Sequence, residues 1–136
     1  MDKITEHVWI GNSDEAKDRE SLRLTGIRST LCLDGCMKGV GAEELGVDRV
    51  EVVELIDGAG NRPEVFLRAV RLLRELAAKH PPVLVHCYAG RSRSAAVVCK
   101  LFMSEEGNSL TEAMRRITSK RKVVIAAALQ ELLDFK

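Results

Sequence analysis

The sequence predicts an α/β domain in which a central mixed sheet of four to five strands is flanked by helices. Short apolar runs alternate with longer amphipathic segments over the first two thirds of the chain, and the last third has a helical pattern throughout. With 136 residues, of which 46% are hydrophobic, the chain can bury one sizeable core and has no room for a second ordinary one. We therefore expect a single domain over residues 1–136.

The first half of the chain contains three predicted strands and one predicted helix. The strands are expected at residues 7–11 (HVWIG), 28–33 (RSTLCL) and 48–55 (DRVEVVEL). The helix is expected over residues 13–26, because Ser13 is a suitable N-terminal cap and Gly26 a suitable stop. These elements alternate in the way that α/β folds require.

The second half begins with the strongest helical signal, over residues 64–80, where Pro63 occupies the start and apolar residues recur at helical spacing. The apolar run 81–86 (PPVLVH) is predicted as the central strand. A largely buried helix is expected at 94–106, ending at Gly107. Ser109 and Glu112 stand at capping-box spacing at the start of a helix over 109–121, and a last helix is expected at 125–135.

Composition excludes several classes of partner. The net charge is +1, and only 4% of residues are aromatic, too few for the stacking on which single-stranded nucleic-acid binding relies. No apolar run is long enough to span a membrane, and the first residues lack the apolar core of a signal peptide. We expect a cytoplasmic protein with no nucleic-acid or membrane partner. Its four cysteines are expected to be reduced thiols, because they form no disulfide framework and no second pair stands at metal-ligand spacing.

The stretch VLVHCYAGRSRS, residues 83–94, places a cysteine and two arginines between a predicted strand and a predicted helix. Such a turn is an anion site, since backbone N–H groups point into it and the helix dipole favours negative charge. The expected phosphate-binding loop consists of Cys87, Tyr88, Ala89, Gly90, Arg91, Ser92 and Arg93. The same donors would stabilise a thiolate at Cys87.

A thiolate beside a phosphate cradle indicates covalent catalysis, in which Cys87 attacks phosphorus and the phosphocysteine is then hydrolysed. Arg93 can hold two phosphoryl oxygens with its planar guanidinium, which lysine cannot do. Ser94 can donate a hydrogen bond to the cysteine sulfur and ease its departure. Gly90 allows the backbone to turn its amides inward.

The pattern His86-Cys87-x-x-Gly90-x-x-Arg93-Ser94 resembles the active-site loop of the cysteine-dependent protein tyrosine phosphatases, and its SRS ending resembles the dual-specificity branch. The resemblance implies a protein tyrosine phosphatase-like fold and a phosphoprotein or phosphopeptide substrate. We expect a monomer, and no metal or cofactor, because Arg93 and the backbone amides supply the charge that a phosphoryl group needs. The resemblance also implies a general acid on a loop after the third strand. Asp57, thirty positions before Cys87, matches that place.

Several of these residues have a second interpretation. Asp57 can serve as a turn residue, in which case Glu54 is the next candidate acid. His86 is expected to point away from the nucleophile and to support the loop by hydrogen bonding. Cys32 and Cys99 are expected in the core and Cys36 in a loop. One of these three thiols could instead protect Cys87 by forming a disulfide.

The function also has alternatives. Arg91 adds a cation that would suit inositol phosphates or other polyanionic esters, unless it forms a surface ion pair with an acid such as Glu64. The Pro-Asn pair that dual-specificity phosphatases tend to have before the last helix is missing, which leaves the polar support of that pocket wall open. An inactive phosphate-binding module and a rhodanese-like sulfur transferase are the remaining alternatives, although rhodanese loops are one residue shorter.

Overall fold

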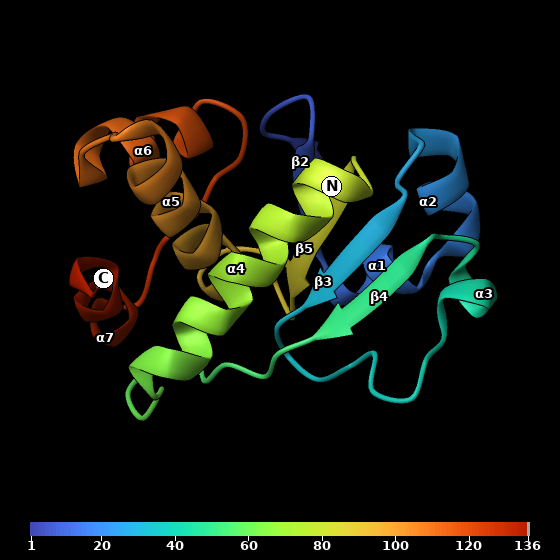
Figure 1. Ribbon diagram of the computed structural model, residues 1–136, viewed down its shortest axis with the longest axis horizontal. Coiled ribbons are helices and arrows are strands. Elements are labelled where there is room, and N and C mark those ends of the chain that lie inside the picture. Colours follow the sequence, from blue (N-terminus) through green and yellow to red (C-terminus); the bar gives the residue numbers. More distant parts are fainter. Residues whose placement is uncertain (136) are drawn as a thin grey trace.

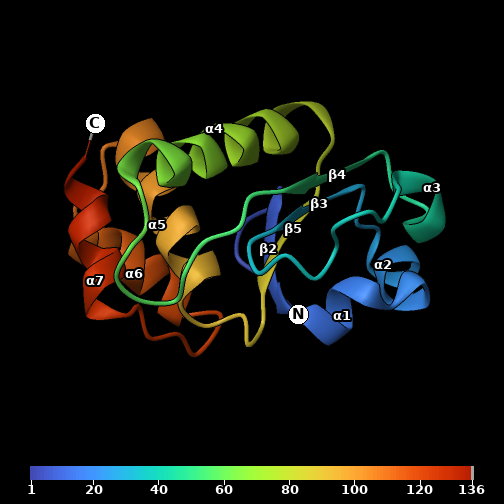
Figure 2. The same cartoon turned by 90° about the horizontal axis from the view of Figure 1, so that it is seen from below.

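The computed structural model describes residues 1–135, so Lys136, the last residue of the predicted domain, lies outside the described residues. The chain forms a five-stranded mixed sheet with helices on both faces (Figures 1 and 2), which confirms the predicted fold class. The strands are β1 (Asp2–Lys3), β2 (Val8–Asn12), β3 (Ser29–Cys32), β4 (Arg49–Val52) and β5 (Val83–Cys87). The helices are α1 (Ser13–Lys17), α2 (Arg19–Thr25), α3 (Ala42–Leu45), α4 (Pro63–Lys79), α5 (Arg93–Glu106), α6 (Leu110–Thr118) and α7 (Ala127–Gln130), followed by a 3₁₀ turn, η1 (Glu131–Asp134).

The strand order β1-β2-β5-β3-β4 places β5 in the middle of the sheet, as predicted. β5 pairs in parallel with both β2 and β3, and all five of its residues are buried. Only β1 runs antiparallel. Because the four longer strands are parallel, their carboxyl ends meet at one edge of the sheet, where ligand sites of α/β folds lie.

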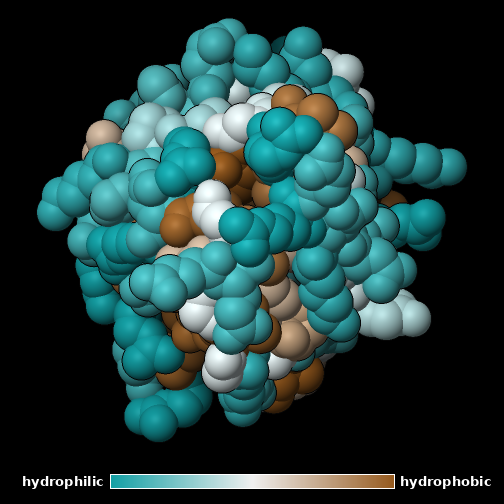
Figure 3. All heavy atoms as spheres, turned by 90° about the vertical axis from the view of Figure 1, so that its right-hand side faces the viewer, coloured by the Kyte–Doolittle hydropathy of each residue, from teal (hydrophilic) through white to brown (hydrophobic). Residues whose placement is uncertain are grey.

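Two helical layers cover the sheet. Figure 2 shows α4 and α5 on one side of it and α1 and α2 on the other. The side of α4 that faces the sheet buries Phe66, Ala69, Val70, Leu73 and Leu76. Burial of one such large apolar side chain contributes about 1.5–3 kcal/mol, so this face fixes α4 firmly. Figure 3, viewed from the side of α2 and α3, shows a mainly hydrophilic surface with small apolar patches.

The predicted helix over residues 13–26 is two helices, and its predicted cap at Ser13 was one residue late. Asn12 caps α1, accepting from the Glu15 amide at 2.9 Å, while the Glu15 carboxylate accepts from the Asn12 amide. Asp18 then breaks the segment: its backbone is extended and its carboxylate accepts from the amides of Glu20 and Ser21. An aspartate that bonds the backbone ahead of it starts a new helix.

The remaining differences concern short elements. β4 is shorter than the predicted 48–55, although the Val53 amide still donates to the carbonyl of Cys32 at the end of β3 and the Leu55 amide to that of Leu33. The predicted last helix is α7 followed by the 3₁₀ turn. β1 and α3 were not predicted, because elements of two and four residues are too short to show a periodic pattern.

Candidate active site

The predicted phosphate-binding loop lies between the carboxyl end of β5 and the first turn of α5. Cys87 is the last residue of β5, and α5 begins at Arg93. Cys87 is buried, and the Ser94 hydroxyl donates a hydrogen bond to its sulfur, with 3.0 Å between Oγ and Sγ. The predicted contact between these two side chains is therefore present, inside the protein.

Gly90 gives the loop its tight turn. Its φ is +65°, in the left-handed region, and a Cβ at this position would collide with the Gly11 carbonyl and the Arg121 guanidinium. Both the backbone conformation and the available space thus require glycine. The first part of the loop is held from β2 and α1, because the Ser13 amide donates to the Tyr88 carbonyl at 3.3 Å.

Arg121 supports the loop, and sequence reasoning missed it. Its Nε donates to the Gly90 carbonyl at 2.7 Å and its Nη2 to the Ala89 carbonyl at 3.3 Å. Its Nη1 forms an ion pair with Asp2 at 2.9 Å. Arg121 thus fixes the carbonyl groups of two consecutive loop residues. In the sequence, Arg121 belongs to the basic run SKRK, which resembles a solvated surface segment.

The pocket wall before the last helix, where the Pro-Asn pair is missing, receives polar support from backbone amides instead. The Val124 amide donates to the Arg91 carbonyl at 3.1 Å, and the Ala126 amide donates to the Ser92 hydroxyl at 3.0 Å. Residues 121–126 thus hold the second half of the loop.

The loop opens into a cavity of about 250 Å³. Its lining residues are Asp57, Cys87, Tyr88, Ala89, Arg91, Ser92, Arg93 and Val124. A larger cavity, of about 620 Å³, lies between α4, α5 and the C-terminal segment. It contains no cysteine and no loop of backbone donors, so the smaller cavity is the one that fits the chemistry.

Arg93 is half-buried and only partly paired. Its Nη1 donates to the Leu55 carbonyl at 3.2 Å, and this bond holds the Arg93 side chain against the segment that follows β4. Its Nε is buried without a hydrogen-bond partner among the described residues. Buried donors are almost always paired in native proteins, so this one is available for an oxygen of a bound phosphoryl group.

Asp57 lines the cavity on the loop between β4 and α4, and its side chain is exposed. Asn61 shapes this loop: its amide oxygen accepts from the Ile56 amide at 2.8 Å, and its Nδ2 donates to the Ile56 carbonyl at 2.7 Å. Glu54, the rival acid, does not line the cavity and forms an ion pair with Lys38. Of the two carboxylates, Asp57 is the one that lines the same cavity as Cys87.

Arg91 lines the cavity and is exposed. The expected ion pair with Glu64 is wrong, because Glu64 pairs with Arg62 at 2.6 Å. Among residues 1–135, Arg91 forms no ion pair at all. Its backbone carbonyl accepts the hydrogen bond from the Val124 amide, and its guanidinium lies at the cavity rim.

His86 lies on the opposite face of β5 from Cys87, as expected, but its predicted role is wrong. Both ring nitrogens are buried without a hydrogen-bond partner in the described chain, so the side chain cannot support the loop by hydrogen bonding. Burial lowers the pKa of His86 to about 4, which leaves the ring neutral. Only its backbone contributes, through a 2.9 Å bond from the Leu33 amide to the His86 carbonyl.

All four cysteines are free thiols. Cys32 and Cys99 are buried and Cys36 is half-buried in the loop after β3, as expected. Cys32 belongs to the core on the α1–α3 side of the sheet, and Cys87 to the core on the α4–α5 side. This separation disfavours a protective disulfide between Cys32 and Cys87.

Within residues 1–135, no helix combines the length and the apolar character that a membrane crossing needs.

Comparison with known proteins agrees with this geometry. The family model "Dual specificity phosphatase, catalytic domain" matches residues 42–136. Dual specificity protein phosphatase 1 of Arabidopsis thaliana is 25% identical over 135 residues, which is 98% of this chain and 67% of that protein. Dual specificity phosphatase 28 of Mus musculus is 30% identical over 121 residues, covering 89% of this chain and 73% of the relative.

Other relatives are longer, since the chain spans 58% of dual specificity protein phosphatase 22-A of Danio rerio and 12% of PHS1 of Arabidopsis thaliana. Among solved structures, a mouse putative dual specificity phosphatase complexed with zinc tungstate superimposes with a TM-score of 0.83 at 25% identity, covering 97% of this chain and 82% of the other. The loop, the fold and the matched family agree, and the chain belongs to the dual specificity phosphatase catalytic-domain family of the cysteine-dependent tyrosine phosphatase superfamily, a family of phosphoric monoester hydrolases.

Proposed function

We propose that this protein dephosphorylates phosphotyrosine, and also phosphoserine and phosphothreonine, in phosphoproteins through a phosphocysteine intermediate. One observation carries the proposal: the buried Cys87 thiol, bonded by Ser94, ends at a cavity that Arg93 and Asp57 also line. Nucleophile, oxyanion donor and acid therefore share one site.

In the first step the Cys87 thiolate attacks phosphorus and the bond between phosphorus and the ester oxygen breaks. The Asp57 carboxyl gives its proton to the leaving oxygen. Arg93 and the inward amides stabilise the charge on the equatorial oxygens of the transition state, so this step requires no metal ion.

In the second step water attacks the phosphocysteine, and the Asp57 carboxylate accepts its proton. The sulfur–phosphorus bond breaks and Cys87 leaves as a thiolate, which the Ser94 hydroxyl stabilises across the 3.0 Å contact. Because both steps need an unoxidised thiol, we further propose that the protein acts in a reducing compartment, the cytoplasm.

The leaving group tests the role of Asp57. Asp57→Asn is expected to lower kcat by about 10²–10³-fold for phenyl phosphate, whose leaving group must be protonated. The loss should be less than about tenfold for an activated ester whose leaving group departs as a stable anion. Steady-state rates on the two esters provide the measurement.

Glu54→Gln is the matched control, because it neutralises a nearby carboxylate that does not line the cavity. It should leave both rates within about twofold of the unmodified protein, as surface changes usually do. Equal losses on both esters in Asp57→Asn would assign Asp57 a structural role.

A second candidate substrate class, inositol phosphates or other polyanionic esters, is favoured by the unpaired guanidinium of Arg91 at the cavity rim. Arg91→Ala is expected to weaken binding of an inositol polyphosphate by about five- to tenfold at low salt, and much less at 0.5 M salt, where exposed charges are screened. The rate on p-nitrophenyl phosphate should change by less than about threefold. Competition assays at both salt concentrations measure the effect.

Arg68→Ala is the control, since it removes another exposed arginine, one that does not line the cavity. If Arg91→Ala and Arg68→Ala weaken polyanion binding equally, Arg91 does not steer such substrates.

A further inference from the structure

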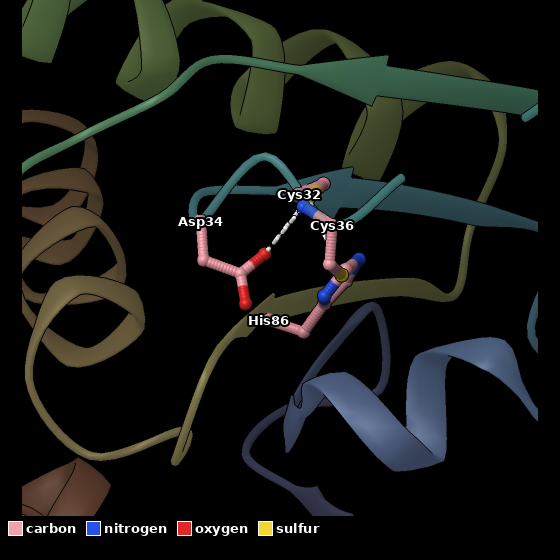
Figure 4. A group of neighbouring side chains, drawn as sticks. All are labelled: Cys32, Asp34, Cys36 and His86. Atoms are coloured by element: carbon pink, nitrogen blue, oxygen red, sulfur yellow. Dashed lines mark hydrogen bonds between the residues drawn. The ribbon is translucent and has the colours of Figure 1, made fainter. Parts of the chain in front are cut away.

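Four metal-ligating side chains meet on the α1–α3 side of the sheet, the face opposite the one on which the Cys87 side chain lies. They are Cys32, Asp34, Cys36 and His86, and their ligand atoms all lie within 4.8 Å of one another. Figure 4 shows Cys32 at the end of β3, His86 on β5, and the other two on the loop after β3, with their side chains turned toward one another. None of the four has a part in the proposed phosphatase chemistry.

The strand register and one turn bring this cluster together. Cys32 and His86 are direct partners in the parallel pairing of β3 with β5, so their side chains lie on the same face. After β3 the chain turns back at Gly35, whose φ is +80°. This turn places the Cys36 sulfur 3.8 Å from the Cys32 sulfur.

Asp34 is oriented toward the two thiols. Its Oδ1 accepts from the Cys36 amide at 3.0 Å and lies 3.2 Å from the Cys32 sulfur. A carboxylate between two thiols is a third ligand already in place.

His86 is the observation that the rest of the fold leaves unexplained. Its side chain has no exposed surface, and neither ring nitrogen has a hydrogen-bond partner among residues 1–135. A buried imidazole without partners is rare in native proteins and requires a reason. A neutral imidazole carries on one ring nitrogen the lone pair that a metal ion uses, and no group of residues 1–135 occupies either nitrogen of His86.

We propose that Cys32, Asp34, Cys36 and His86 form a binding site for a zinc ion. A tetrahedral Zn²⁺ with Zn–S bonds of about 2.3 Å separates two sulfur ligands by about 3.8 Å, and the two sulfurs lie 3.8 Å apart. Two thiols and an imidazole with one carboxylate oxygen suit Zn²⁺ and do not suit Mg²⁺ or Ca²⁺, which prefer oxygen ligands.

Metal binding is balanced by release of two protons. Cys32 and Cys36 are free thiols, and each gives up its proton when its sulfur ligates the ion. Zn²⁺ replaces one proton on each sulfur and takes the free lone pairs of His86 and Asp34. Asp34 and Cys36 are only half-buried, so the ion can enter from the loop side.

Zinc binding is tested on the full chain in a Cys87→Ser background, which removes the active-site thiol as a competing ligand. Titration of the reduced, chelator-treated protein against a chromophoric zinc chelator is expected to give one bound Zn²⁺ per chain. A hundredfold excess of free Zn²⁺ over its Kd should raise Tm by roughly 5–10 °C. Co²⁺ bound at the same site should show the absorption of tetrahedral thiolate coordination.

Cys36→Ser removes one half-buried ligand and should weaken zinc binding at least about 100-fold, with loss of the Co²⁺ thiolate absorption. Cys99→Ala is the matched control, because it removes a thiol outside the cluster and should keep one Zn²⁺ per chain. Circular dichroism confirms that each variant is folded. None of these readouts depends on phosphatase activity, so the zinc proposal can be contradicted without affecting the proposed function, and the reverse also holds.

Two results overturn the zinc site. In one, the folded protein binds no Zn²⁺, or binds it with equal affinity in Cys36→Ser. In the other, the reduced protein binds no Zn²⁺, and mild oxidation forms a disulfide between Cys32 and Cys36. Mass spectrometry would show this disulfide as a loss of two hydrogens, and the two thiols would then be a redox pair.

Discussion

Replacement of Cys87 by serine is expected to lower kcat for p-nitrophenyl phosphate by at least about 10⁴-fold, because the hydroxyl that replaces the thiol stays protonated and cannot attack phosphorus. The loop itself should persist, since its shape depends on Gly90, Arg121 and the amides of Val124 and Ala126. Vanadate or phosphate binding should therefore remain within about tenfold of the unmodified protein. Steady-state kinetics and calorimetric titration measure the two effects.

Cys99→Ser is the matched control, since it makes the same chemical change at a buried thiol that does not line the cavity. It should retain most of the activity in the folded fraction. Substantial turnover by Cys87→Ser would contradict the covalent mechanism, and loss of anion binding in that variant would mean that Cys87 also maintains the loop.

Replacement of Arg93 by lysine is expected to lower kcat/KM by roughly 10³-fold although the positive charge is kept. The reason is geometric: Arg93 is anchored by Nη1 to the Leu55 carbonyl and leaves its buried Nε for the ligand, whereas lysine has one ammonium group that cannot do both. Kinetics on p-nitrophenyl phosphate, with vanadate inhibition measured in parallel, test this.

Arg93→Ala provides the comparison for Arg93→Lys. If planarity matters more than charge, the two variants should be within about tenfold of each other. Recovery of near-normal kcat/KM in Arg93→Lys would show that charge alone suffices and that the guanidinium geometry is unnecessary.

The sequence predicted well those parts of the protein whose structure depends on residues close together in the chain. Cys87, Gly90, Arg93 and Ser94 lie within eight consecutive residues, so their spacing alone predicts a loop between strand and helix, and the structure places them there. Their catalytic roles stay predictions. α4 was predicted equally well, because its seventeen residues begin at a proline and have helical periodicity.

Features that depend on contacts between distant segments could not be predicted. The zinc-ligand cluster exists because β5 lies beside β3, so that His86 meets Cys32, and no sequence pattern specified that strand order. The same holds for the break at Asp18, where a capping aspartate prevailed over a continuous helical pattern. Local propensity describes segments, and tertiary packing decides which segments meet.

Arg121 has a consequence for how far the catalytic motif can be moved. Its guanidinium binds the loop carbonyls while it pairs with Asp2, 119 positions earlier in the chain. The carbonyls of the loop are thus held by residues from distant parts of the sequence, which the strand–loop–helix segment alone does not contain. Transfer of the motif alone to another protein is therefore not expected to reproduce the loop. A designer who grafts residues 83–106 onto another sheet must also provide a cation that binds the loop carbonyls and a carboxylate that pairs with this cation.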